Sequence, residues 1–235
     1  MRSLYISDLH LSDERPEANE RFFAFMENEA PGAGELFVLG DLFEYWVGDD
    51  DLDDAFHAIV AAFFRRYTGA GGKLFVLHGN RDFLMGERFA AATGAVLLSD
   101  PALRGETLLM HGDTLCTDDL DYQAWRHTAR SENWQREFLA RPLAERRRLV
   151  RGLREKSKEV IQAKAAEIMD VNEQAVREAL RVHRATRLVH GHTHRPGHHV
   201  LEVDGRRCER WVLPDWYGAG GYLEIAPEKA RLVRW

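Results

Sequence analysis

The chain has 235 residues, of which 45% are hydrophobic and 30% are charged, a balance typical of a soluble globular protein rather than a disordered one. Its 32 basic and 38 acidic side chains give a formal charge of −6, which argues against a general nucleic-acid binder. Two cysteines are too few for a disulfide framework, and no apolar run approaches the roughly 18 residues that a membrane span needs. We therefore expect a cytoplasmic protein without a secretion signal.

Five short apolar runs, each followed at once by polar residues capable of chemistry, lie along the chain. The runs cover residues 4–6, 36–39, 74–77, 108–110 and 188–189. Each is continuously apolar, as in strands buried on both faces. Helical periodicity over 18–29 and 52–67 places helices between the first three strands, so the sequence predicts an α/β fold. Chemistry in such sheets lies beyond the carboxyl ends of the strands, where all five polar groups fall.

Residues 117–184 differ from the rest because they show no strand pattern and read as several helices. Within them, residues 141–164 hold nine basic and three acidic side chains, a local charge of +6. We interpret 117–184 as a helical cap inserted between the fourth and fifth strands of a single domain that spans 1–235. Strand patterns after His194 predict an antiparallel continuation of the sheet. These patterns cover residues 200–203, 211–213, 222–225 and 231–235.

Seven candidate metal ligands follow the five strands. They are Asp8, His10, Asp41, Asn80, His111, His192 and His194. Their carboxylate, amide and imidazole donors suit Mn, Fe or Zn, without the thiolates of structural zinc. Asp8 and His10 are two residues apart, as are His192 and His194, so each pair projects to the same side of an extended chain. Two such pairs with a shared carboxylate are sufficient to hold two metal ions close together.

The motifs that contain these residues carry a resemblance to a known family. They are Asp8-Leu9-His10, Gly40-Asp41, Gly79-Asn80, His111-Gly112-Asp113 and Gly191-His192-Thr193-His194. In this order they resemble the motifs of the calcineurin-like metallophosphoesterases, which are two-metal phosphoester hydrolases. The resemblance implies a two-sheet α/β/β/α sandwich, here with a helical cap. Residues 40–50, 78–84, 111–119 and 168–172 more closely resemble one branch, the UDP-2,3-diacylglucosamine hydrolases of the lipid A pathway.

That branch implies a reaction, a cofactor and a location. The reaction is cleavage of the pyrophosphate bond of UDP-2,3-diacylglucosamine into UMP and 2,3-diacylglucosamine 1-phosphate, by attack of a water that two metal ions activate. The cofactor is a pair of divalent ions, expected to be Mn²⁺. The expected partners are the UDP-linked acylated glucosamine and the cytoplasmic side of the inner membrane, with no nucleic acid, for a protein expected to be a monomer.

The resemblance also assigns residues. The first metal is expected on Asp8, His10, Asp41 and His194, and the second on Asp41, Asn80, His111 and His192, with Asp41 as the bridge. The expected catalytic residues are Asp41, Asn80, Arg81 and His111. The expected substrate contacts are Asn80, Arg81, Asp119, Ser157, Lys164 and His192, to which the basic segment adds Arg154. One family contact position, usually Asn, is Ile161 here, so that contact is in doubt.

The chemistry of Arg81 provides an argument about the reaction that does not depend on the resemblance. Many relatives in the superfamily carry His after Gly-Asn, and that His can protonate an alkoxide leaving group. A guanidinium stays protonated and is a poor general acid, but its planar fork suits phosphate oxygens. Arg81 therefore favours cleavage of a pyrophosphate, whose leaving group is itself a phosphate. The alternative is that Arg81 only forms a salt bridge with Asp82 or another neighbour.

Other interpretations stay open. The chain could be another metallophosphoesterase, such as a nucleotide pyrophosphatase or phosphodiesterase, or a non-enzymatic scaffold, although no ligand is missing. The basic segment is either a solvated helix or a surface for phosphates and lipid. The acidic residues 49–54 are interpreted as a solvated helix start. Five side chains are candidates for an acyl-binding lining, and each is equally compatible with an ordinary core: Trp46, Tyr122, Trp125, Phe138 and Met169.

Overall fold

The computed structural model describes residues 1–163, 170–227 and 229–235, with the backbone alone for 155–163. Its strands are β1 (Ser3–Ile6), β2 (Glu35–Leu39), β3 (Lys73–Leu77), β4 (Ala95–Leu98), β5 (Ala102–Arg104), β6 (Thr107–Leu109), β7 (Arg187–His190), β8 (Gly197–Val203), β9 (Arg206–Val212), β10 (Gly221–Ala226) and β11 (Lys229–Arg234). Its α-helices are α1 (Pro16–Asn28), α2 (Ala55–Gly69), α3 (Glu87–Thr93), α4 (Leu120–Ala129), α5 (Glu132–Leu139), α6 (Leu143–Ala163) and α7 (Glu173–Val182). Short 3-10 turns cover Ala30–Gly32, Asp49–Asp53 and Asp113–Leu115.

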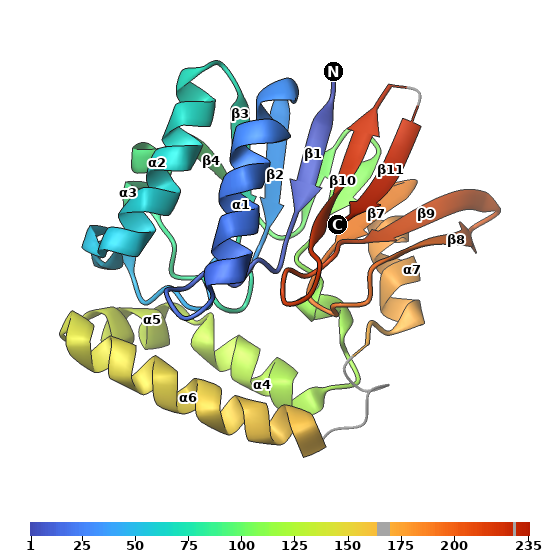
Figure 1. The fold of residues 1–235 in the computed structure, drawn as a ribbon. Helices are drawn as coiled ribbons and strands as arrows, with labels where there is room; N and C mark the ends of the chain where they lie inside the picture. The colour runs from blue at the N-terminus through green and yellow to red at the C-terminus, as the bar shows by residue number, and fades with distance from the viewer. Residues whose placement is uncertain (164–169, 228) are drawn as a thin grey trace.

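The strands form two sheets that pack face to face (Figure 1). The first sheet has the order β11-β10-β1-β2-β3-β4, and the second has the order β5-β6-β7-β9-β8. Helices α1 and α2 cover the outer face of the first sheet, and α7 covers the outer face of the second. The predicted α/β/β/α sandwich is confirmed.

Alternation along the central strands explains why each is continuously apolar after its polar first residue. In β1, Leu4 and Ile6 join Phe22 of α1 in the outer core, whereas Tyr5 faces the second sheet. Strands β2 and β3 repeat this pattern. A strand covered on both faces has no position for a polar side chain, so the period-two signal of a half-exposed strand is absent.

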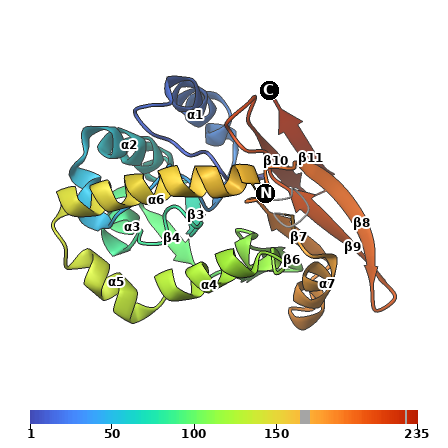
Figure 2. The ribbon, with the colours of Figure 1, turned by 90° about the horizontal axis from the view of Figure 1, so that it is seen from below.

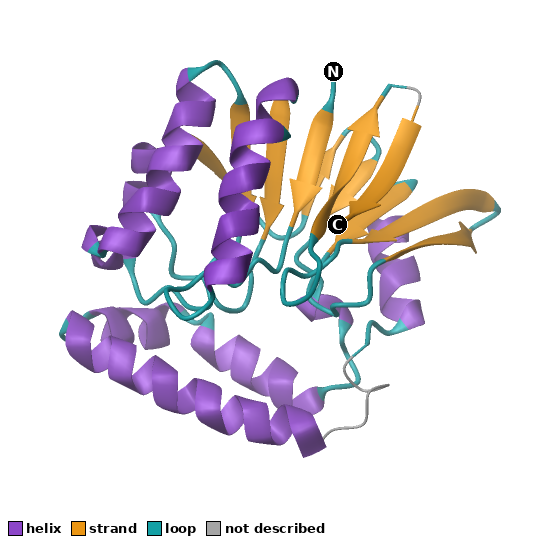
Figure 3. Ribbon diagram, viewed as in Figure 1, coloured by secondary structure: helices purple, strands orange, loops and turns teal. Residues whose placement is uncertain are grey.

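Parallel pairing brings the carboxyl ends of the chemically important strands to one edge of the sandwich. β1, β2 and β3 run parallel to one another, and β6 runs parallel to β7. The carboxyl ends of β1 and β2 point toward the helices α4 to α6 (Figure 3). The loops that follow these strands therefore lie between the sandwich and these three helices.

Two features of the sheets differ from the sequence prediction. β10 and β11 extend the first sheet in antiparallel pairing, as expected, but β9 pairs in parallel with β7. The antiparallel hairpin of β8 and β9 places its second strand beside β7, so β7 and β8, which follow each other in sequence, are not neighbours in the sheet. The sequence also gave no indication of β4 and β5, which are short and mostly partly exposed.

The helices between β6 and β7 divide into two groups. α4, α5 and α6 lie below the strand ends, with α6 crossing the view from below (Figure 2). α7 instead packs Val176 and Leu180 against Leu108 and Leu188 of the second sheet. We call α4, α5 and α6 the cap helices. Within the described residues, no helix combines the length and the apolarity that a bilayer crossing requires.

Candidate metal centre

The seven predicted ligands all lie in loops that directly follow strands β1, β2, β3, β6 and β7. Asp8, His10, Asp41 and His111 are at most 2% exposed. Four ionisable side chains this deeply buried require partners, because an unpaired charge away from water is strongly destabilising. The strand order thus brings together residues that are up to 186 positions apart.

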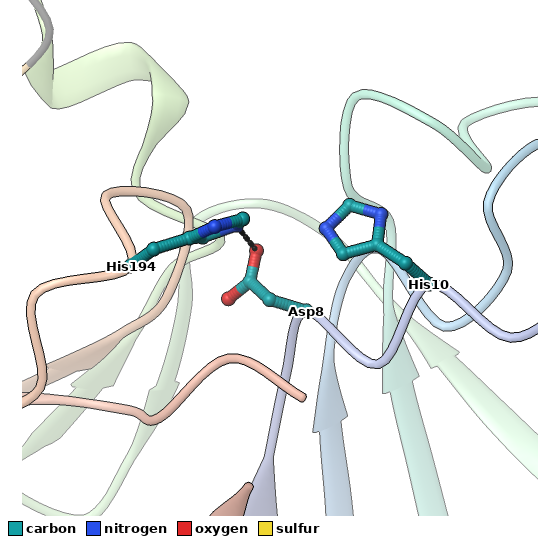
Figure 4. Close-up of side chains that lie close together, drawn as sticks. All are labelled: Asp8, His10 and His194. Atoms are coloured by element: carbon teal, nitrogen blue, oxygen red, sulfur yellow. Dashed lines mark ion pairs between the residues drawn. The ribbon is translucent and has the colours of Figure 1, made fainter. Parts of the chain in front are cut away.

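Two groups of side chains have the spacing of metal ligands. Asp8, His10 and His194 place one ligand atom each within 4.8 Å of one another (Figure 4). Asp8, Asp41 and His111 form a second group by the same measure. Asp8 Oδ1 lies 3.5 Å from His194 Nε2. Asp8 therefore belongs to both groups.

Asp41 lies between the two groups as well. Its Oδ2 is 3.8 Å from His10 Nε2, and its Oδ1 is 3.7 Å from His111 Nε2. The two oxygens of one carboxylate thus face opposite sides of the cluster. This arrangement is the one that a bridging ligand needs, although the bridging role itself stays a prediction.

Asn80 and His192 complete the cluster. Asn80 Oδ1 lies 3.0 Å from His111 Nε2 and 3.0 Å from His192 Nδ1. Asp8 Oδ2 accepts a hydrogen bond from the main-chain N–H of His192 at 2.9 Å. The structure therefore brings all seven predicted ligands into one cluster.

The backbone of the cluster is strained. Among the described residues, seven non-glycine residues have a positive φ, and five of them are predicted ligands. They are Asp8 (55°), His10 (50°), Asp41 (53°), His192 (67°) and His194 (55°). Left-handed backbone is unfavourable for side chains with a Cβ and concentrates at functional sites. The chain at these residues is therefore not extended, unlike the chain that the sequence analysis assumed for the pairs two residues apart, and the side chains converge through left-handed backbone instead.

Two glycines allow the ligand loops to approach each other. A Cβ on Gly79 would lie 2.0 Å from Asp41 Oδ1, and a Cβ on Gly191 would lie 2.1 Å from Asp8 Oδ2. Contacts this short are impossible for any other residue type. The glycines that precede Asn80 and His192 are therefore required by packing against the carboxylates.

The electrostatics of the cluster fit divalent cations. Burial lowers the pKa of His10, so its ring is neutral at neutral pH, and neither ring nitrogen has a hydrogen-bond partner in the described part of the chain. Burial raises the pKa of Asp41 to about 7. Burial disfavours a charged His111, but the carboxylates of Asp41 and Asp8 raise its pKa to about 9. His10 offers a neutral imidazole, whereas His111 and Asp41 hold protons that a bound cation would displace, because metal ligands must be deprotonated.

Asp82, which the sequence analysis did not select as a site residue, joins two ligand loops. Its carboxylate accepts main-chain hydrogen bonds from Leu42 and Gly79, each at 2.8 Å. In the other direction, Asp41 Oδ1 accepts a hydrogen bond from the main-chain N–H of Arg81 at 2.8 Å. The loops after β2 and β3 are therefore locked together by two carboxylates. No local sequence signal distinguishes this role from that of an exposed Asp.

The Arg81 side chain is not engaged in the alternative role considered above. Asp82 uses its oxygens for main-chain N–H groups, and the Arg81 guanidinium forms no ion pair with any residue that the structure describes. Its Nε is buried without a hydrogen-bond partner. A guanidinium at the cluster without an internal carboxylate partner is suited to an external anion.

Asp113 connects the cluster to the first cap helix. It accepts hydrogen bonds from Tyr122 Oη at 2.9 Å and from Arg126 Nε at 2.7 Å. The Tyr122 ring centroid lies 5.7 Å from that of His192. Asp113 is buried beside His111, so α4 is attached directly behind the second group of ligands.

The predicted substrate contacts in the cap are only partly described. Arg154 Nη2 lies 2.5 Å from Glu44 Oε1, next to the cluster. Asp119 caps α4 by accepting the Tyr122 N–H at 3.1 Å. The side chains of Ser157 and Ile161, and all of Lys164, lie outside the described residues.

The acidic run, which the sequence analysis interpreted as a solvated helix start, pairs with part of the basic segment, for which a solvated helix and a phosphate- or lipid-binding surface were both left open. Arg146 is 3% exposed and pairs with Asp50, and Arg147 Nε donates to Asp51 at 2.7 Å. The interpretation of 49–54 as a solvated helix start is therefore wrong in part, because Asp51 is fully buried. These pairs join residues 96 positions apart, which a local reading of charge cannot detect.

The candidate acyl-lining residues fall into core residues and exposed residues. Trp46 is 2% exposed and stacks on Phe43, so it belongs to the core. Trp125 is 43% exposed and packs edge-on against Trp134, which stacks on Phe138. Trp125 and Trp134 form an apolar surface of α4 and α5, and Phe138, which is 5% exposed, is buried against Trp134. Met169 lies outside the described residues.

Comparison with known proteins defines the class that the sandwich and its metal-ligand cluster represent. The family model of the calcineurin-like phosphoesterases matches residues 1–196. The chain therefore belongs to the calcineurin-like phosphoesterase family, whose members use divalent metal ions.

Individual relatives narrow the assignment. A UDP-2,3-diacylglucosamine hydrolase of Aromatoleum aromaticum is 50% identical, covering 95% of this chain and 92% of that protein. Proteins of the same name from Chromohalobacter salexigens and Klebsiella pneumoniae are 45% and 44% identical, covering 94% and 99% of this chain and 92% and 98% of their own lengths. Within the calcineurin-like phosphoesterases, the chain belongs to the UDP-2,3-diacylglucosamine hydrolases.

Proposed function

We propose that this protein hydrolyses the pyrophosphate bond of UDP-2,3-diacylglucosamine, giving UMP and 2,3-diacylglucosamine 1-phosphate. The observation that carries the proposal is the identity of 50% to a relative of that name over 95% of the chain, a span too long to omit the cap helices. A non-enzymatic scaffold is disfavoured because all seven predicted ligand residues are present and converge. A phosphodiesterase with an alkoxide leaving group is disfavoured because Arg81 is a poor general acid.

We assign the metal ligands as the family motifs imply. The first ion would be held by Asp8, His10, Asp41 and His194, and the second by Asp41, Asn80, His111 and His192. Manganese is the proposed ion, because oxygen and imidazole donors without thiolate suit it. When bound, two such ions would lower the pKa of a water and neutralise charge on the phosphates. Binding of the leaving phosphate and of the rest of the substrate is assigned to side chains of the protein.

Arg81 is proposed to bind the phosphate that leaves. Its main-chain N–H is fixed by Asp41 Oδ1, so the side chain starts from a defined position beside the cluster. The guanidinium can donate two parallel hydrogen bonds to phosphate oxygens and thereby stabilise the charge that develops in the transition state. Asn80 and His192 are proposed to contact the substrate as well as the second ion. His111 is proposed to serve as a ligand of the second ion and to position the side chain of Asn80, whose Oδ1 it faces.

The cap helices are proposed to select the substrate, within a single domain of residues 1–235. Asp119, Arg154, Ser157 and Lys164 are the proposed contacts. The apolar surface of α4 and α5 offers burial for acyl chains, each methylene of which is worth about 0.8 kcal/mol. Selectivity has to come from such a region, because metal ions alone hydrolyse many phosphoesters.

We further propose that the protein works as a monomer at the cytoplasmic side of the inner membrane. Its proposed substrate carries two acyl chains and therefore resides in a bilayer. Arg148 and Arg151 are exposed on α6, where they would be attracted to anionic headgroups. The association would be peripheral.

The test is turnover by the purified protein. UDP-2,3-diacylglucosamine in detergent micelles is incubated with Mn²⁺, Mg²⁺ or Zn²⁺ in turn, and products are identified by mass spectrometry. We expect UMP and the diacylated sugar phosphate, with activity lost on chelation and restored best by Mn²⁺. Absence of these products with every metal would refute the proposed function.

A further inference from the structure

Glu44 is a buried carboxylate where the cap helices meet the metal centre. It lies three residues after Asp41, and its main-chain N–H donates to the carbonyl of Leu11 at 3.0 Å. The residue is 2% exposed. Its backbone is thus held by the segment that carries His10 and by the segment that carries Asp41.

The side chain of Glu44 meets groups from three distant segments. Arg154 Nη2 of α6 lies 2.5 Å from Oε1. Tyr217 Oη donates to Oε2 at 3.2 Å, and Arg15 Nη1 lies 3.9 Å from the same oxygen. Oε2 is also 4.0 Å from His10 Nδ1, next to the first group of ligands.

This arrangement fixes a flexible cationic side chain. A free arginine loses considerable rotamer entropy when it is held in one position, so a partner is needed to keep it there. Glu44 provides that partner in a place shielded from water, where an ionic hydrogen bond is strong. The Arg154 side chain is 16% exposed and therefore not free to swing into solvent.

The charges around Glu44 still favour an anion. Two guanidinium groups, those of Arg154 and Arg15, share one carboxylate, so the group keeps a net positive charge. Arg81 adds a third guanidinium that is close enough to influence the pKa of Tyr217. A phosphate that approaches the metal centre would meet this positive side.

The other described anchors of α6 differ from this one. Arg146 and Arg147 pair with Asp50 and Asp51 at the N-terminal half of the helix. Those pairs attach α6 to the 3-10 turn Asp49–Asp53. Among the ion pairs of the described residues, the pair of Arg154 with Glu44 is the one that ties α6 to the ligand loops.

We propose that Glu44 is a positioning residue, which holds Arg154 beside the metal centre so that its guanidinium meets a phosphate of the substrate. The inference rests on the proposed function and adds a residue that acts through Arg154. Loss of Glu44 should therefore weaken substrate binding more than it slows the chemical step.

The experiment compares Glu44→Gln, Arg154→Ala and the double variant. Glutamine keeps the volume and an acceptor for Tyr217, but it removes the charge that pairs with Arg154. We expect Glu44→Gln to raise KM for UDP-2,3-diacylglucosamine about tenfold with kcat within about threefold, and with wild-type metal content. The double variant should be no worse than Arg154→Ala, because both changes remove one interaction. Asp50→Asn, which removes the charge that pairs with Arg146 at another anchor of α6, is the matched control and should leave KM within about twofold.

Several results would overturn the inference. They are a wild-type KM in Glu44→Gln, multiplicative effects in the double variant, or loss of metal. An equal loss of turnover on bis(p-nitrophenyl) phosphate would show that Glu44 supports the metal centre instead.

If Glu44→Gln does not fold, Glu44→Asp replaces it and should give an intermediate KM. A wild-type KM in Glu44→Asp would contradict the inference. A wild-type protein without turnover of the UDP-linked lipid would refute the proposed function, whereas an active wild type with an unaffected variant refutes only this inference.

Discussion

Asp41 Oδ1 accepts a hydrogen bond from the main-chain N–H of Arg81 at 2.8 Å, so the proposed metal bridge also positions the proposed phosphate-binding residue. Ion binding and leaving-group stabilisation thus depend on one carboxylate. Its second oxygen faces His10, on the other side of the cluster. A substitution at Asp41 should therefore impair both ion binding and leaving-group stabilisation. A substitution at Arg81 should impair only leaving-group stabilisation.

Replacing Asp41 with alanine should abolish activity and lower the metal content by about two ions per chain, because one carboxylate is shared by both ions. Metal content is measured by mass spectrometry of the desalted protein. Asp13→Ala, at an exposed position, is the control and should retain both ions. Full metal occupancy with normal turnover in Asp41→Ala would show that Asp41 is not the bridge.

Replacing Arg81 with alanine should lower kcat by roughly 10² or more, because charge stabilisation in the transition state is lost. The protein should remain folded and should bind its metal ions, since the Arg81 side chain forms no ion pair with a described residue. Arg81→His should not restore the rate on the pyrophosphate substrate. A wild-type rate in the alanine variant would contradict the role assigned to the guanidinium.

Replacing Asp82 with asparagine should weaken metal binding by about 10- to 100-fold, because a residue that orients the ligand loops is altered. The main-chain N–H groups of Leu42 and Gly79 donate to different oxygens of the Asp82 carboxylate. An asparagine side chain keeps one acceptor oxygen, so one of these two hydrogen bonds is lost and the new NH2 group faces that main-chain donor. Calorimetric titration of the apo protein with Mn²⁺ measures the affinity. Asp13→Asn serves as the control, and an unchanged affinity in Asp82→Asn would mean that the loops hold their positions without this contact.

Replacing Arg146 with alanine should lower the free energy of unfolding by about 2 kcal/mol, because a buried guanidinium loses its bonds to Asp50 and to the Val47 carbonyl. Arg148→Ala, on the exposed side of the same helix, should change it by at most about 0.5 kcal/mol. Urea denaturation compares the two. Equal effects would mean that the basic segment is not anchored through Arg146.

The ligand cluster could be predicted from sequence because two rules act together. Apolar strands buried on both faces are visible as short continuous runs, and parallel pairing places whatever follows them at one edge. Asp8, Asp41 and His111 were found in this way. The rules say nothing about residues whose role depends on a distant partner, which is why Asp82 and Glu44 were missed.

Long-range pairing also explains the errors of the sequence analysis. The charges of 141–164 appeared to be available for phosphates, but Arg146 and Arg147 are neutralised by acids about a hundred positions earlier. Likewise, no local pattern indicates that β9 pairs in parallel with β7. The positive φ angles at the ligands have no sequence signal either, since Asp and His occur in every kind of loop.

Changing Arg154 and Lys164 together to alanine should lower kcat/KM for the acylated substrate by a larger factor than for bis(p-nitrophenyl) phosphate. The reason is that the cap is proposed to recognise the lipid-linked diphosphate, whereas the small ester needs mainly the metal centre. Both substrates are assayed on one sample with the same metal loading. Equal losses would show that these residues support the fold or the metal centre, and the lipid-recognition role of 141–164 would then be abandoned.

The most direct test of the whole account is the ratio of kcat/KM for UDP-2,3-diacylglucosamine to that for UDP-glucosamine without acyl chains, measured on one Mn²⁺-loaded sample. The account assigns bond cleavage to the metal centre and substrate selection to the cap helices. It therefore predicts a large ratio that falls steeply as the acyl chains are shortened, because each lost methylene removes about 0.8 kcal/mol of burial. A ratio near one, with both substrates cleaved to UMP, would contradict it.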